Sequence, residues 1–170
     1  QIGISRLEQV RDIFLFCCLT GLAYVDVASL STENIVEGKR GRQWLRKARN
    51  KTNNMCNIPL LRPALRILEK YAEYRAATGR LLPVPSNQKM NAYLKELATL
   101  CGVAKNLTTH CARHTFATTV TLANGASLEN VSKMLGHSSI RMTQHYAKIL
   151  NSSIERDMDK IESELIGEDE

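Results

Sequence analysis

The 170-residue sequence contains no apolar run of the roughly 18–20 residues that a membrane-spanning helix requires. Its N-terminus lacks the basic and then apolar stretch of a secretory signal, and no internal repeat or low-complexity segment is present. These absences argue against a membrane role and favour one ordinary globular domain. A chain of this length can bury a hydrophobic core.

The cysteines show no pairing pattern. The chain has five cysteines, an odd number, and none of them forms a Cys-x-x-Cys pair. This usage favours reduced, mostly buried thiols in a cytoplasmic protein rather than a disulfide framework.

Charge is divided between the two ends of the chain. The net charge is +6, yet residues 151–170 hold eight acidic and two basic residues, and residues 1–150 hold 21 basic and nine acidic ones. The basic body favours binding to a polyanion, with a merely soluble basic protein as the alternative. The acidic end predicts an amphipathic helix, because one apolar stripe recurs at helical spacing: Ile154, Met158, Ile161 and Leu165.

Hydrophobic periodicity and turn residues predict a mainly helical α+β domain with a small β-sheet. Short strands are expected over 34–36, 43–49 and 55–58. Helices are expected over about 6–19, 24–30, 63–79, 86–102, 109–122, 127–136 and 139–146.

The segment over 39–51 is strongly basic. It has seven basic residues in 13 and includes Trp44, which indicates a hairpin laid along a nucleic-acid backbone. The alternative is a solvated edge whose charge discourages sheet aggregation. The basic residues are Lys39, Arg40, Arg42, Arg46, Lys47, Arg49 and Lys51.

All four histidines lie in one quarter of the chain, over 108–149. His110 and Arg113 are three residues apart on a predicted helix and therefore share a face. Arginine can hold two phosphate oxygens, and histidine can add a hydrogen bond or move a proton. His137 follows a predicted helix end, and Tyr146 lies nine residues further. A tyrosine oxygen can attack phosphorus if cations stabilise the transition state and a neighbour assists proton transfer.

Other interpretations of these residues stay open. His110 and His114 are four residues apart, a spacing that also suits zinc, although the glutamate of a His-Glu-x-x-His motif is missing and Arg113 would lie beside the metal. His114 can instead be a packing residue. A single tyrosine on a short helix is also compatible with a place in the core.

Three motifs together resemble the catalytic domain of the tyrosine recombinases, the phage integrase family. They are His-Cys-Ala-Arg-His-Thr-Phe-Ala from 110, Leu-Gly-His-Ser-Ser from 135 and Thr-Gln-His-Tyr from 143, in the family's order and spacing. The similarity extends over about residues 5–150. It implies a fold of mixed helices with a small three-stranded antiparallel sheet.

The resemblance also implies a role for each matching residue. Tyr146 is expected to be the nucleophile that forms a 3′-phosphotyrosine and releases a 5′-hydroxyl. Arg113 is expected to hold the scissile phosphate, and His110 and His137 to hydrogen-bond it and assist proton transfer. Lys51, in a segment that resembles the family's β-hairpin, is expected to be the general acid. No metal or other cofactor is implied, because the phosphotyrosine conserves the bond energy for rejoining.

One position departs from the family pattern. The first catalytic arginine of the family follows Thr-Gly-Leu, but Ala23 stands there. Asp26 still matches the acidic residue that supports this arginine. If 49–51 are extended, Arg49 and Lys51 project from one strand face, so Arg49 is the hypothesised substitute, with Arg46 second. Some conjugative-transposon integrases resemble this variant more than the phage enzymes do.

The resemblance also predicts domain organisation and partners. Residues 1–150 are expected to form the catalytic domain, and 151–170 an acidic helical tail that packs on a neighbouring protomer or on its own body. Double-stranded DNA, an N-terminal core-binding domain of the same protein and a homo-tetramer on DNA are the expected partners, with a monomer when isolated, in the bacterial cytoplasm.

The leading function is therefore a site-specific DNA recombinase or integrase of a mobile element. The alternatives are a catalytically weak DNA-binding protein of the same fold, suggested by Ala23, and a metal-dependent hydrolase that uses His110 and His114.

Overall fold

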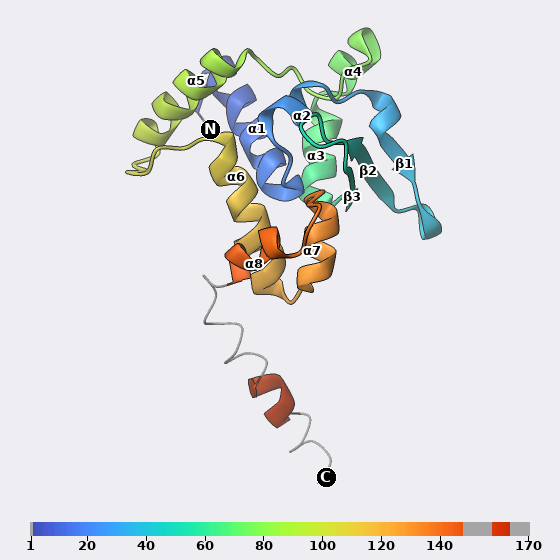
Figure 1. Ribbon diagram of the computed structural model, residues 1–170. Coiled ribbons are helices and arrows are strands. Elements are labelled where there is room, and N and C mark those ends of the chain that lie inside the picture. Colours follow the sequence, from blue (N-terminus) through green and yellow to red (C-terminus); the bar gives the residue numbers. More distant parts are fainter. Residues whose placement is uncertain (1, 148–157, 164–170) are drawn as a thin grey trace.

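The computed structural model describes residues 2–147 and 158–163 of the chain. Figure 1 shows a small sheet at one side of a group of helices. The sheet is antiparallel with the order β1-β2-β3, so the predicted fold class, mainly helical α+β with three antiparallel strands, is confirmed. Within the described ranges no helix is both long and apolar enough to cross a bilayer.

The first half of the chain contains the long helix α1, the three strands of the sheet and several short helices. In chain order the elements are α1 (Ser5–Thr20), α2 (Tyr24–Ala28), η1 (Thr32–Asn34), β1 (Ile35–Glu37), η2 (Lys39–Gly41), β2 (Gln43–Ala48), β3 (Met55–Pro59), α3 (Arg62–Lys70) and α4 (Ala72–Thr78).

The second half is helical and carries the clustered histidines. Its elements are α5 (Asn87–Leu100), α6 (Thr109–Thr115), the π-helical η3 (Phe116–Thr121), the short 3-10 helix η4 (Leu122–Asn124), α7 (Leu128–Met134) and α8 (Arg141–Ala147). Three of these helices begin with a side-chain cap, because Ser86, Thr108 and Ser127 each accept a backbone N–H of the first turn.

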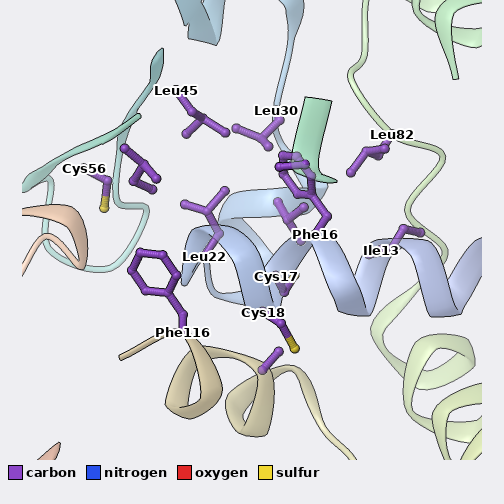
Figure 2. Close-up of a cluster of buried hydrophobic side chains, with 14 of the residues drawn as sticks. Ile13, Phe16, Cys17, Cys18, Leu22, Leu30, Leu45, Cys56, Leu82 and Phe116 are labelled. Carbon is purple, nitrogen blue, oxygen red and sulfur yellow. The ribbon is translucent and has the colours of Figure 1, made fainter. Parts of the chain in front are cut away.

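Helix α1 lies at the centre of the core. It packs against α3, α5 and α6, and its residues Ile13, Phe16 and Cys17 are fully buried. Figure 2 shows these side chains gathered with Leu45 of the sheet and Phe116 of η3. Burial of such side chains is the main driving force for folding. The core therefore fixes the sheet, α1 and the helix that follows α6 relative to one another.

The sheet turns one of its faces into this core. Leu45 pairs with Ile58, and both are buried, as is Cys56 two residues before Ile58. Because side chains alternate along a strand, Arg49, which directly follows β2, continues on the inward side set by Leu45 and Lys47.

Two predicted elements differ in detail from the structure. The helix expected over 63–79 is broken at Tyr71, whose φ and ψ are −104° and 25°. At this break both Lys70 and Tyr71 donate to the buried carboxylate of Asp12 on α1, at 2.6 and 3.0 Å. The helix expected over 109–122 changes from α to π after Thr115. There the buried Thr121 hydroxyl donates to backbone carbonyls four and five residues back, both at 2.9 Å.

The premise that 49–51 are extended is wrong. Strand β2 ends at Ala48, and residues 50–52 form the turn to β3. The backbone of Arg49 bonds to Asn54 and Asn53 across this turn, at 3.0 and 2.8 Å. The tail prediction falls mostly outside the described residues. Residues 158–163 are helical and exposed, and Ile154 and Leu165 lie outside the described ranges.

Candidate active site

Arg113 is the buried cation at the centre of the histidine-rich segment. It lies in the last turn of α6 and is only 6% exposed. Its guanidinium donates to the carbonyl oxygens of Gly21 and Leu135, at 2.5 and 2.8 Å. Burial and then the positive charge of Arg49 lower the pKa of Arg113.

The Thr20-Gly21-Leu22 turn after α1 is held against α6 and η3. Gly21 has φ 69°, and a Cβ there would lie 2.4 Å from the Phe116 ring. Only glycine permits both this conformation and this approach. The carbonyl of Gly21 is thereby held where Arg113 can reach it.

His137 is presented by the end of α7. Gly136 has φ 61° and closes the helix, and the backbone N–H of His137 bonds to the carbonyl of Ser132 at 3.0 Å. The ring Nε2 lies 3.1 Å from Nη2 of Arg113, and Nδ1 lies 2.8 Å from the Thr143 hydroxyl. Burial and the charges of Arg113 and Arg49 lower the pKa of His137 to about 4.

Tyr146 lies on α8 beside the same group of residues. It is 7% exposed, and its ring is parallel to that of His137, with 6.3 Å between the centroids and 6° between the planes. The His114 ring contacts Tyr146 edge-on at 4.9 Å. Tyr146 and Arg113 are therefore both neighbours of His137, as their predicted joint role requires.

His110 lies next to His114, whose ring also contacts Tyr146. Its Nε2 lies 3.1 Å from Nε2 of His114, and the two rings meet at 4.6 Å. Burial and then the charge of His110 lower the pKa of His114. Within 2–147 and 158–163, no group of three or more His, Cys, Asp and Glu residues has a metal-binding arrangement.

Arg49 enters the site from the sheet. Its Nε lies 3.6 Å from the carboxylate of Asp26, which is 1% exposed and also accepts the backbone N–H of Asn50 at 2.8 Å. The Arg49 side chain passes Gly136, where a Cβ would lie 2.9 Å from Cδ of Arg49. The Arg49 Nε is buried and makes no hydrogen bond within the part of the chain that the structure describes.

The remaining predicted residues are spread along the sheet. Lys51 is exposed in the β2–β3 turn, two residues after Arg49, and Arg46 is exposed on β2. Lys39, Arg40 and Arg42 lie at the other end of β2, in and after η2. With the half-buried Lys47 on β2, the basic residues therefore form a line along the sheet rather than one cluster at the site.

The family model of the phage integrase family matches residues 6–152. The chain belongs to the phage integrase family. Tyrosine recombinase XerD of Rhizobium meliloti is 32% identical over 146 residues, which cover 79% of this chain and 45% of that protein. Tyrosine recombinase XerD of Staphylococcus saprophyticus is 42% identical over 71 residues, which cover 42% of this chain and 24% of that protein. The chain thus spans less than half the length of these two relatives.

Solved structures share the integrase-family fold. The XerH site-specific recombinase in a post-cleavage complex with difH substrate superimposes with a TM-score of 0.70 at 17% identity, over 94% of this chain and 48% of that one. The Tn1549 transposon integrase in complex with circular intermediate DNA gives a TM-score of 0.61 at 17% identity, over 92% of this chain and 64% of that one.

Sequence reasoning missed three groups of the site. Two are the carbonyls of Gly21 and Leu135 that hold Arg113, and the third is the hydroxyl of Thr143. Sequence did offer a signal for each, because Gly21 lies in the Thr-Gly-Leu turn, Leu135 begins the Leu-Gly-His motif, and Thr143 begins the motif that ends at Tyr146.

Proposed function

We propose that this integrase-family protein breaks and rejoins DNA strands at specific sites, with Tyr146 as the nucleophile. The observation that carries the proposal is the grouping of Tyr146, His137 and Arg113, in which His137 lies 3.1 Å from Arg113 and its ring is parallel to that of Tyr146 with 6.3 Å between the centroids. A nucleophile, a proton-handling ring and a buried cation are the groups that transfer of a phosphodiester to a protein oxygen requires. Relatives that are called tyrosine recombinases and neighbours bound to DNA support the assignment.

In this proposal each residue acts on one scissile phosphate. The Tyr146 oxygen attacks phosphorus, the 5′-oxygen leaves, and a 3′-phosphotyrosine holds the broken strand. Arg113 binds the non-bridging oxygens, and His110 and His137 hydrogen-bond them and assist proton transfer. Lys51, in the exposed turn, gives the leaving oxygen its proton.

The family pattern places a phosphate-binding arginine at position 23, and Ala23 cannot fill that role. In this proposal Arg49 supplies the missing cation. Its pairing with Asp26, the acid expected to support the missing arginine, favours it over Arg46, whose side chain is exposed on β2. A buried N–H without a hydrogen-bond partner is a group that a phosphate oxygen can satisfy. The cation thus comes from the sheet instead of from the start of α2.

Double-stranded DNA is the proposed partner, bound through its phosphates by the basic residues along the sheet. These are Lys39, Arg40, Arg42, Arg46 and Lys47. Transposon and phage integrases among the structural neighbours support a role in integrating a mobile element.

Assembly on DNA forms a further part of the proposal. Residues 1–150 act as the catalytic domain with a core-binding domain of the same protein, four copies assemble on DNA, and the acidic tail over 151–170 packs on a neighbouring protomer. Met158 and Ile161 of the tail helix are 59% and 48% exposed, which leaves an apolar stripe to be covered. Sedimentation of the protein with and without 151–170 tests this, and an unchanged distribution at all concentrations would contradict it.

The second candidate function is DNA binding with weak or no cleavage, which the alanine at position 23 favours. One experiment separates the two functions. The protein is incubated with a pool of duplexes that carry a nick and have randomised central base pairs. The nick lets the short 5′ product diffuse away, which traps the covalent intermediate. We expect a covalent protein–DNA adduct that resists denaturation and disappears in Tyr146→Phe. Binding without any adduct would instead establish the second function.

A further inference from the structure

The hydroxyl of Thr143 has no part in the roles assigned above. Thr143 lies on α8, is 0% exposed, and its Oγ1 lies 2.8 Å from Nδ1 of His137. Its backbone N–H is already bonded to the carbonyl of Ile140 at 2.9 Å. Helix α8 begins at Arg141, so Thr143 lies past the cap position, and its side chain is directed at the histidine.

The partner of the other ring nitrogen determines where the proton of His137 lies. Nε2 is 3.1 Å from Nη2 of Arg113, and a guanidinium can only donate hydrogen bonds. Nε2 must therefore accept, and in a neutral ring the proton is then on Nδ1. Nδ1–H donates to Oγ1 of Thr143, and the two contacts together are consistent with only one neutral tautomer.

We propose that Thr143 is a positioning residue that holds His137 in the tautomer whose Nε2 is a proton acceptor facing Arg113. The tautomer follows from the contacts of His137 alone, and only its effect on catalysis rests on the proposed function. A proton taken up at Nε2 makes both ring nitrogens donors, and Thr143 still accepts from Nδ1. The same hydroxyl thus satisfies the ring before and after it gains a proton, whereas the opposite tautomer would direct Nε2–H at the Arg113 guanidinium.

The groups that face His137 come from three other places in the fold. Arg113 from α6 and Arg49 after β2 both lower its affinity for a proton, and the Tyr146 ring lies parallel to it from α8. Among these neighbours Thr143 is a neutral group that accepts from the ring. Its removal is therefore expected to affect proton uptake without altering the surrounding charge.

Thr143→Val tests the proposal, because valine keeps the shape of threonine and removes the hydroxyl. Thr143→Ser keeps the hydroxyl. Thr121→Val is the matched control, since the hydroxyl of this other buried threonine bonds only to backbone carbonyls among the described residues. The readout is nitrogen NMR of the histidine rings in the free protein. The chain has only four histidines, and His137→Gln assigns the relevant signal.

We expect His137 to carry its proton on Nδ1 at neutral pH in the wild type, Thr143→Ser and Thr121→Val. In Thr143→Val a fraction with Nε2–H should appear, and the midpoint of the His137 titration should fall. A wild-type ring with its proton on Nε2, or an unchanged ring in Thr143→Val, would overturn the proposal. If Thr143→Val does not fold, the wild-type spectrum tests the proposal by itself, and a proton on Nε2 of His137 would overturn it.

Adduct formation with nicked DNA provides the functional arm. Thr143→Val should slow it by about 10-fold or more, the loss typical when a group that orients a functional histidine is removed. Thr143→Ser and Thr121→Val should stay close to the wild-type rate, because both keep the hydroxyl that faces His137. Equal rates in Thr143→Val and Thr121→Val would also count against the proposal. A wild type that forms no adduct defeats the proposed function but leaves the NMR test of Thr143 intact.

Discussion

Nε of Arg49 lies 3.6 Å from the carboxylate of Asp26, although the two residues come from different secondary-structure elements. Asp26 is in α2, three residues after Ala23, and Arg49 directly follows β2. Side-chain alternation from Leu45 directs Arg49 inward, and the turn at 50–52 leaves Lys51 outside. The acid that the family pattern associates with its first arginine is thus paired with a cation from the sheet.

Asp26→Asn should disturb both stability and cleavage. The substitution keeps the shape but removes the charge, so the guanidinium of Arg49, whose side chain is 11% exposed, loses its counter-charge. Breaking such a buried pair is expected to lower the free energy of unfolding by about 3 kcal/mol. Chemical denaturation measures this loss.

Asp12→Asn is the control for this substitution. Asp12 is a second buried carboxylate with charged partners, Arg11 and Lys70, and it lies away from the site. Both variants should be less stable, but only Asp26→Asn should slow adduct formation under conditions where the protein is folded. Equal slowing in both would mean that the Asp26 effect is one of stability alone.

Gly136→Ala should move Arg49 as well as strain the backbone. A Cβ at Gly136 would lie 2.7 Å from Sγ of Cys56 and 2.9 Å from Cδ of Arg49, and φ is 61°. The backbone conformation alone costs about 1–2 kcal/mol for alanine. Gly79→Ala isolates that cost, because Gly79 has φ 70° with nothing within 4 Å of its Cβ position. In thermal denaturation Gly136→Ala should be the less stable variant, and equal losses would contradict the packing described.

Stability should fall on acidification because of His137. Its pKa is about 4 in the folded protein and near 6.5 when unfolded, so the unfolded state binds more protons between these values. The contribution is complete above pH 6.5 and is lost as pH falls toward 4. We expect about 1–2 kcal/mol, since water screens part of this half-buried site. His137→Gln should make the unfolding free energy less dependent on pH across this window, and an unchanged slope would exclude His137 as the source.

The sequence was sufficient to predict the helices and strands that have strong local signals. Helix α1, the three strands and the helices α5, α6 and α7 follow from hydrophobic periodicity and turn residues. The motifs placed His137 and Tyr146 in one neighbourhood, and the structure brings their rings together.

The remaining features depend on tertiary contacts that local patterns do not contain. The break at Tyr71 accompanies hydrogen bonds to Asp12, 59 residues away in the chain. The end of β2 at Ala48 reflects turn bonds of Arg49, so the face of Lys51 could not be deduced from an assumed extended strand. From the sequence alone Arg49 is only a hypothesis, and it takes the folded chain to reveal Asp26 as its partner.

The most direct test of the account is single-turnover adduct formation on nicked DNA by Arg49→Ala, with Arg46→Ala as the matched control. Loss of a cation that stabilises the transition state should slow Arg49→Ala by about 100-fold or more. The exposed Arg46 should matter much less. Ala23→Arg, introduced into Arg49→Ala, should restore part of the rate by returning a cation to the family's position. Cleavage by Arg49→Ala at the wild-type rate would show that Arg49 does not replace the missing arginine.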